Sequence, residues 1–107
     1  MKPEFSWSKK EKEIARRAFK RAYEREMKEL TDKTRRIATR AESPEDIWGL
    51  HDFLSEKRKE IDFKYDFRYS VLITVFARLI REGWVDLADL EGLDKEKIAR
   101  VQSLLEL

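Results

Sequence analysis

The sequence lacks the residues on which many small proteins build a reactive or metal-binding site. It contains no cysteine, which excludes a disulfide framework, a thiolate metal site and a cysteine nucleophile. With a single histidine in 107 residues, a metal site built on several histidines would need a second subunit. No serine elbow, glycine-rich phosphate loop or paired-carboxylate metal spacing is present either. We therefore expect no catalytic residue, no metal and no cofactor.

Turn-forming residues and long apolar runs are also scarce. Three glycines and two prolines leave few sites for turns, so the secondary-structure elements must be long. No apolar run reaches the roughly 18 residues that a membrane-spanning helix needs, and the N-terminus has no apolar core of a signal peptide. The expectation is a soluble, cytoplasmic protein that does not insert into a membrane.

What the chain does contain is charge together with enough apolar surface to fold. Charged residues make up 43% and hydrophobic residues 41% of the sequence, and twelve aromatic side chains can contribute to a core. A length of 107 residues corresponds to one domain, so we expect residues 1–107 to form a single unit. The patterns described next predict that this unit is all-α.

The first helix is expected to be unusually long. Ser8 and Glu11 have the spacing of a capping box, and nothing interrupts a helix from there to Ser43. A helix of about 32 residues is roughly 48 Å long, whereas a compact domain of this size is about 35 Å across. Since its apolar positions are sparse, a second copy of the chain is the simplest cover for its far end. We predict an elongated homodimer with Ile37 and Ile47 in the interface.

A second helix is expected from Pro44, with Ser43 as its cap, to between Ile61 and Tyr65. At 100° per residue, one stripe of this helix is apolar and formed by Leu50, Leu54 and Ile61, with Phe53 beside it. The opposite flank mixes an aromatic residue with polar and charged ones, and we call it the mixed flank. Its residues are Trp48, His51, Asp52, Ser55, Arg58 and Asp62.

The remaining residues predict a small helical head. Residues 69–82 form the most hydrophobic stretch of the chain, and Glu82 followed by Gly83 is typical of a helix end. A short helical turn over 85–90 and a last helix capped by Asp94 complete the pattern. We therefore expect residues 1–65 to supply the long helices and dimer contacts, and residues 66–107 to form the head.

The distribution of charge leaves nucleic-acid binding open as an alternative. Residues 1–40 hold fourteen Lys and Arg against seven Asp and Glu, although the net charge of the chain is only +2. A basic helix with aromatic residues can follow phosphates and stack on bases. Glutamates are interleaved with the basic residues, however, and no helix-turn-helix spacing is evident, so a solvated charged helix explains the pattern more simply.

The mixed flank of the second helix is the best candidate for a protein-binding surface. Tryptophan and arginine are the residues that most often anchor protein–protein contacts. The alternative is that Trp48 packs beneath the first helix and Arg58 pairs with an acidic side chain. His51 and Asp52 are adjacent and point about 100° apart on a helix, so we do not expect them to bond to each other or to act as a proton shuttle.

The stretch from Ile47 to Val85 resembles the fluorescence recovery protein family of cyanobacteria. The residues that carry the resemblance are Trp48, Leu50, His51, Asp52, Phe53, Leu54, Ser55, Lys57, Arg58, Glu60, Ile61, Asp62, Lys64, Tyr65, Asp66, Arg68, Ser70, Val71, Val75, Phe76, Ala77, Glu82 and Gly83. Weaker similarity extends through Trp7, Ser8, Ala22, Tyr23, Arg25 and Glu26 and forward to the C-terminus.

This resemblance implies an all-helical homodimeric regulator without cofactor or catalytic residues. Its implied partner is the photoactivated form of the orange carotenoid protein, whose return to the resting form it accelerates, ending quenching at the phycobilisome. The resemblance also implies that the protein is cytoplasmic and associates with thylakoids through that partner. The implied partner-binding residues are Trp48, His51, Asp52 and Arg58, with a second contact region in the head around Phe76 and Arg100. The alternative is a related dimeric interaction module from a bacterium without that partner.

Overall fold

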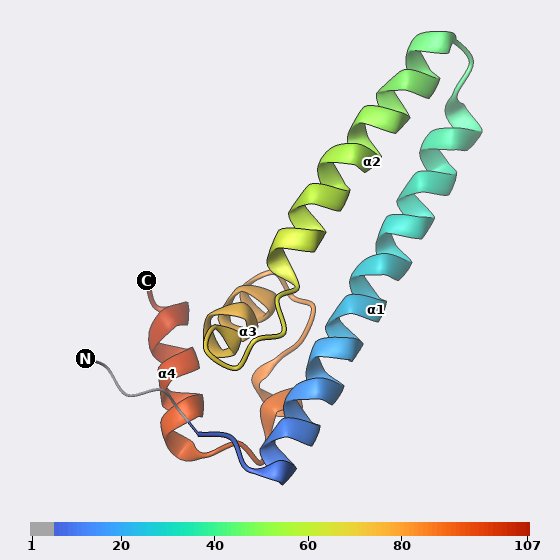
Figure 1. Ribbon diagram of the computed structural model, residues 1–107. Helices are drawn as coiled ribbons and strands as arrows, with labels where there is room; N and C mark the ends of the chain where they lie inside the picture. The colour runs from blue at the N-terminus through green and yellow to red at the C-terminus, as the bar shows by residue number, and fades with distance from the viewer. Residues whose placement is uncertain (1–5) are drawn as a thin grey trace.

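The computed structural model describes residues 6–107 and contains helices and connecting turns (Figure 1). Its elements are α1 (Lys9–Arg40), α2 (Pro44–Lys64), α3 (Leu72–Arg81), the 3-10 helix η1 (Leu87–Leu90) and α4 (Lys95–Leu105). Helices α1 and α2 form a long antiparallel hairpin, and α3, η1 and α4 gather around one end of α1 (Figure 1). The predicted all-α fold with a helical hairpin and a small head is confirmed.

Side-chain caps fix where the two long helices begin. The backbone N–H of Glu11 donates to Ser8 Oγ at 3.1 Å, and the Ser8 N–H donates to Glu11 Oε1 at 3.0 Å. Ser43 and Asp46 form the same reciprocal pair at the start of α2. Each pair satisfies donors that a helix start would otherwise leave without partners. The expected first helix of 32 residues is confirmed.

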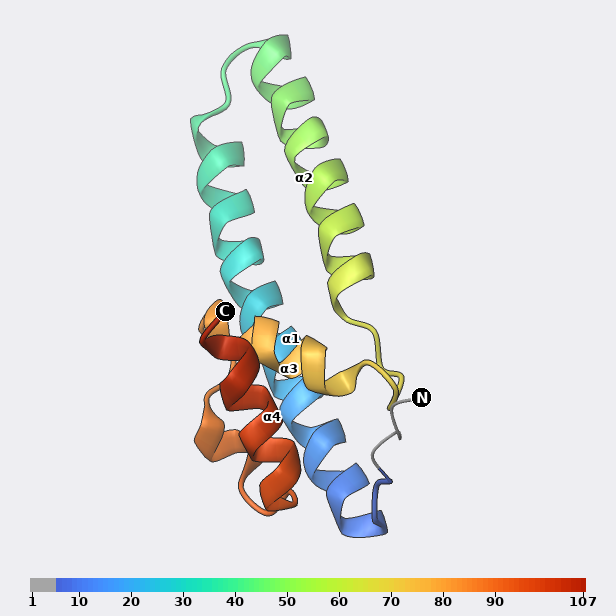
Figure 2. The same ribbon diagram turned by 90° about the vertical axis from the view of Figure 1, so that its left-hand side faces the viewer.

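The molecule is elongated because the hairpin extends beyond the head. Its principal extents are 54 × 27 × 25 Å, and its radius of gyration is 17.0 Å, against about 13 Å for a compact domain of this length. Away from the head only α1 and α2 lie against each other (Figures 1 and 2). We call this two-helix part, residues 27–63, the stalk. Among the residues of α2, only Ile61 and Lys64 are buried.

The core lies in the head, with α3 at its centre between α4 and α1 (Figure 2). Phe76 and Leu79 are fully buried, and α3 exposes little besides Thr74 and two arginines. The helix begins at Leu72 rather than at residue 69, because residues 69–71 form a turn in which the Val71 N–H donates to the Arg68 carbonyl at 3.0 Å.

The first half of α1 contributes to the same core. Its buried apolar residues are Ile14, Ala15, Ala18 and Ala22, and they belong to one cluster with those of α3, η1 and α4. Small alanine side chains allow the head to approach α1 closely. Consequently the chain has one core, and a boundary at residue 65 divides the sequence but does not separate two packed units.

The segment that joins α2 to α3 packs on α1 through aromatic edges. The ring of Phe19 lies 5.4 Å from that of Tyr65 and 4.9 Å from that of Phe67, both nearly perpendicular. Tyr23 contacts Tyr65 in the same way at 5.1 Å. Edge-to-face geometry is the favoured arrangement of aromatic pairs. These contacts hold the connection between stalk and head against one face of α1.

Two glycines occur where the backbone requires them. Gly83 has φ +86 and follows α3, which confirms the helix end predicted from Glu82 and Gly83. Gly92 has φ +105, and a Cβ atom there would lie 2.6 Å from Ile14 Cδ1. A side chain at residue 92 would therefore be strained and would collide with the core.

The carboxylate of Glu11 ties the start of α1 to α4. Besides capping α1, it accepts from the backbone N–H of Asp94 at 2.9 Å and from Lys97 Nζ at 3.0 Å. Burial alone would raise the pKa of Glu11, but the N–H groups of Ser8 and Asp94 and the ammonium of Lys97 outweigh it and lower this pKa to about 2.

The depressed pKa predicts how stability responds to acid. Because the pKa of Glu11 is lower in the folded chain than in the unfolded chain, its contribution is complete above about pH 4.5 and is lost as the pH falls towards 2. Glu11→Gln should lower the free energy of unfolding at pH 7 by about 2 kcal/mol and flatten its pH dependence in that window. Urea denaturation between pH 2 and 7 measures both, with the exposed Glu13→Gln as the control. Parallel curves for Glu11→Gln and the parent would contradict the prediction.

Candidate partner-binding surface

The mixed flank of α2 is exposed along its whole length. We call it the α2 outer face, and it consists of Trp48, His51, Asp52, Ser55, Arg58 and Asp62. Trp48 is 64% exposed, so the alternative in which it packs beneath the first helix is wrong for this chain. The apolar stripe turned towards α1 is what keeps these residues outside: Ile61 on it is buried, and Leu50 and Leu54 are partly buried.

Contacts within the α2 outer face are few and open to solvent. The imidazole of His51 lies edge-on to the Trp48 ring at 6.3 Å. His51 Nδ1 lies 3.3 Å from Asp52 Oδ1, which corrects the expectation that these adjacent side chains do not bond. Flexible side chains can turn towards each other even when their Cα–Cβ bonds diverge by 100°. Both side chains are largely exposed to solvent.

The guanidinium of Arg58 is free to meet a partner. Its Nε lies 3.6 Å from Asp62 Oδ2 one turn further along α2, and the two side chains are 84% and 70% exposed. Such an exposed pair contributes little to stability, so a carboxylate of another protein can replace Asp62 at small cost. A shallow groove of about 480 Å³ runs along this part of α2, lined by His51, Leu54, Ser55, Arg58, Lys59 and Asp62.

The two head residues implied by the family resemblance have different environments. Arg100 is exposed on α4, where a partner can reach it. Phe76 is fully buried at the centre of α3, which corrects the expectation that it contacts a partner. A ring in the close-packed head is inaccessible unless the head unfolds, and its role here is structural.

The two residues predicted for the dimer interface lie near the tip of the hairpin. Ile47 is 51% exposed in the single chain, and Ile37 is partly buried. An open groove of about 340 Å³ lies beside Ile37 and is lined by Arg40, Ala41, Glu45, Asp46, Gly49, Leu50 and Phe53. Half-exposed aliphatic side chains beside a groove are suited to an apolar contact.

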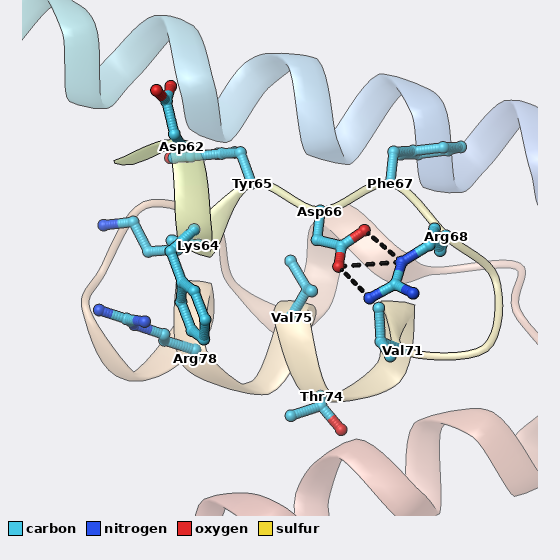
Figure 3. A pocket seen from close by; sticks show the side chains of 11 residues that line it. Asp62, Lys64, Tyr65, Asp66, Phe67, Arg68, Val71, Thr74, Val75 and Arg78 are labelled. Carbon is cyan, nitrogen blue, oxygen red and sulfur yellow. Dashed lines mark hydrogen bonds and ion pairs between the residues drawn. The ribbon is translucent and has the colours of Figure 1, made fainter. Parts of the chain in front are cut away.

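A hollow of about 670 Å³ lies where α2 gives way to α3 (Figure 3). Asp66 and Arg68 face each other on its wall with three contacts of 2.6–3.1 Å (Figure 3). The bidentate bond from Arg68 lowers the pKa of Asp66. Phe63 lines the same hollow and is 81% exposed. Sequence analysis assigned no role to these residues, and helix periodicity carries no signal for them because they flank or belong to a loop.

Two further observations limit the chemistry of the described chain. Within residues 6–107, the structure brings together no group of three or more His, Asp or Glu side chains placed to hold a metal ion. None of the helices in this range combines the length and the apolarity needed to cross a bilayer.

Comparison with known proteins agrees with the helical architecture. Residues 7–105 match the family described as photoprotection regulator fluorescence recovery protein. The chain belongs to the fluorescence recovery protein family. A fluorescence recovery protein from Synechocystis sp. (strain PCC 6803) is 42% identical over 104 residues, which is 97% of this chain and 95% of that protein.

Solved structures of fluorescence recovery proteins share the fold. The protein from Fremyella diplosiphon is 51% identical and superposes with a TM-score of 0.91, covering 95% of this chain and 100% of that one. The Synechocystis structure gives the same TM-score at 42% identity with the same coverage. Membership of the family identifies the chain as a photoprotection regulator and confirms the resemblance found in the sequence.

Proposed function

We propose that this protein binds the photoactivated orange carotenoid protein and accelerates its return to the resting form, which ends quenching at the phycobilisome. The observation that carries the proposal is the exposed α2 outer face, where Trp48 and Arg58 are largely open to solvent in a member of a family of photoprotection regulators. Acting on a phycobilisome-bound partner, the protein would work in the cytoplasm at the thylakoid surface.

The proposed mechanism requires no catalytic residue. A binding protein accelerates relaxation only if it stabilises the transition state more than the photoactivated state, because equal binding of both changes no rate. Gripping one domain of an opened partner and holding the other within reach raises the effective concentration of the two. Trp48 supplies an aromatic anchor, and Arg58 can form two parallel bonds with a carboxylate.

A homodimer is part of the same proposal. The stalk has only two helices, and within one chain they leave Ile47 half-exposed and bury Ile37 only in part. A second copy placed against the hairpin tip would cover them and present two α2 outer faces. Two faces on one rigid body suit a partner that must be held at two points.

The proposal is tested by the rate at which the photoconverted carotenoid protein recovers in the dark. Arg58→Lys keeps the charge but loses the two-pronged bond, and Trp48→Ala removes the anchor. Arg58→Lys should reduce acceleration about ten- to a hundredfold, corresponding to the roughly 1.5–3 kcal/mol of a charge-assisted contact. Trp48→Ala should reduce it through the loss of apolar contact area. Lys10→Arg, an exposed change on α1, is the matched control and should behave as the parent.

Two outcomes would contradict the proposal in different ways. If both variants accelerate recovery as the parent does, with unchanged circular dichroism, the α2 outer face is not the binding surface. If the parent itself gives no acceleration while folded, the partner is another protein, as in the alternative of an interaction module without the carotenoid protein.

A further inference from the structure

A buried ionic cluster joins the stalk to the head. Lys64, the last residue of α2, has a fully buried side chain. Its Nζ donates to Glu26 Oε2 on α1 and to Glu82 Oε1 at the end of α3, both at 2.7 Å. The Glu26 side chain is 6% and that of Glu82 31% exposed. We call Glu26, Lys64 and Glu82 the ion triad.

Every carboxylate oxygen of the ion triad accepts a hydrogen bond. The Tyr65 hydroxyl donates to Glu26 Oε1 at 2.8 Å, and Arg78 Nε donates to Glu82 Oε2 at 2.8 Å. The Trp84 indole N–H also donates to Glu82 Oε1, at 3.1 Å. Burial would raise the pKa of Glu82, but the bonds from Lys64 and Arg78 outweigh it, so this pKa is lowered and the carboxylate is ionised.

A satisfied buried ion pair is a weak source of stability compared with apolar packing, but it is directional. Each bond has a narrow range of lengths and angles, and breaking one leaves a buried charge without a partner. Ile61 is the only other buried residue of α2. The tilt of α2 against the head therefore depends on the ion triad together with the aromatic contacts of Tyr65 on α1.

Small changes at this joint are amplified along α2. Trp48 stands 16 residues before Lys64, which is about 24 Å along the helix axis. A tilt of about 10° at Lys64 would displace Trp48 by about 4 Å, far more than a hydrogen-bonded contact tolerates. Arg100 lies in the head, beyond the same joint, and would not move with α2.

We propose that Lys64 is a positioning residue, whose bonds to Glu26 and Glu82 set the angle between the α2 outer face and the head so that one partner contacts Trp48, Arg58 and Arg100 together. The expected effect on partner binding rests on the proposed function. The role of Lys64 in setting the angle rests only on the contacts of the ion triad. Lys64 does not itself touch the partner, because its side chain is buried.

The test uses the full chain with three variants. Lys64→Met removes the shared cation and leaves two carboxylates facing each other. A combined variant, Glu26→Gln with Lys64→Met and Glu82→Gln, removes the bridge without leaving a buried charge unpaired and keeps the test valid if Lys64→Met does not fold. Lys28→Met on α1 is the matched control, because this lysine lies outside the α2 outer face, has an 80% exposed side chain and pairs with Asp32 at 3.3 Å.

The first readout is geometric and is independent of any partner. Since the chain has no cysteine, Glu45→Cys at the start of α2 and Gln102→Cys on α4 can carry spin labels at two exposed positions. Pulsed electron spin resonance on labelled chains diluted with unlabelled chains then reports the distance between stalk and head. Lys64→Met or the combined variant should shift or broaden this distance distribution, whereas Lys28→Met should leave it unchanged. An unchanged distribution in folded variants would overturn the inference.

The second readout is the dark recovery rate of the photoconverted carotenoid protein. We expect a loss of at least tenfold in acceleration for the variants that lack the bridge, at helix content equal to that of the parent, and none for Lys28→Met. Parent-like acceleration in these variants would overturn the positioning role. If the unmodified chain does not accelerate recovery, the proposed function is contradicted instead. The distance measurement then tests by itself whether Lys64 sets the angle between α2 and the head.

Discussion

Phe76→Ala is expected to lower the free energy of unfolding by about 3–5 kcal/mol, which combines lost apolar burial with the cost of the cavity left behind. Phe76 has no exposed surface and is the largest of the fully buried side chains. A domain of this size has only about 5–15 kcal/mol of stability in total. The substitution should therefore remove a large share of the stability of the chain.

Denaturant unfolding followed by circular dichroism measures this loss. Phe63→Ala is the matched control, since it removes the same ring from a site that is 81% exposed and should change stability by no more than about 0.5 kcal/mol. A Phe76→Ala chain as stable as the parent would contradict the buried position. If such a chain had also lost its effect on carotenoid-protein recovery, Phe76 would return to the binding surface that the family resemblance implied.

Ile47→Glu is expected to convert the proposed homodimer into monomers. Ile47 is 51% exposed in the single chain and lies near the hairpin tip, where a second copy would cover it. Placing an ionised carboxylate in an apolar interface costs several kcal/mol unless it takes up a proton, because no partner charge replaces its hydration. Size-exclusion chromatography with light scattering distinguishes a 12.9 kDa monomer from a particle of twice that mass.

The control for this prediction is Phe63→Glu. It introduces the same charge at another exposed apolar residue of α2, at the end away from the hairpin tip. The control should remain dimeric. A parent chain that elutes as a monomer at micromolar concentration would contradict the dimer, and dissociation by both variants would show that charge rather than position is responsible.

Much of the architecture could be predicted from the sequence, because its signals are local. Ser8 with Glu11 and Ser43 with Pro44 mark helix starts, and Gly83 marks a helix end, since each acts on backbone groups within a few residues. The spacing of apolar residues in α2 likewise predicted which side of the helix would be exposed. These features gave the helix order, the excess length of α1 and the α2 outer face before any tertiary contact was known.

Local sequence signals could not predict that α3 begins at Leu72. Residues 69–71 are apolar enough to continue a helix, but the aromatic contacts of the preceding segment with α1 and the turn at Arg68 hold them in another conformation. The pairing of His51 with Asp52 was missed for a related reason: helix geometry fixes the Cβ direction and leaves the side-chain torsions free.

The sequence by itself determined the family, the helices and the exposed flank that we propose as the binding surface, because each depends on residues near one another in the chain. Only the tertiary structure decided that Phe76 is inaccessible, that the first half of α1 completes the head, and that Lys64 is buried between Glu26 and Glu82. Glu26 and Lys64 are 38 residues apart, and nothing local to either distinguishes it from the many other charged residues of the chain. Long-range packing brings the two residues together and buries Lys64 at the point where α2 meets the head.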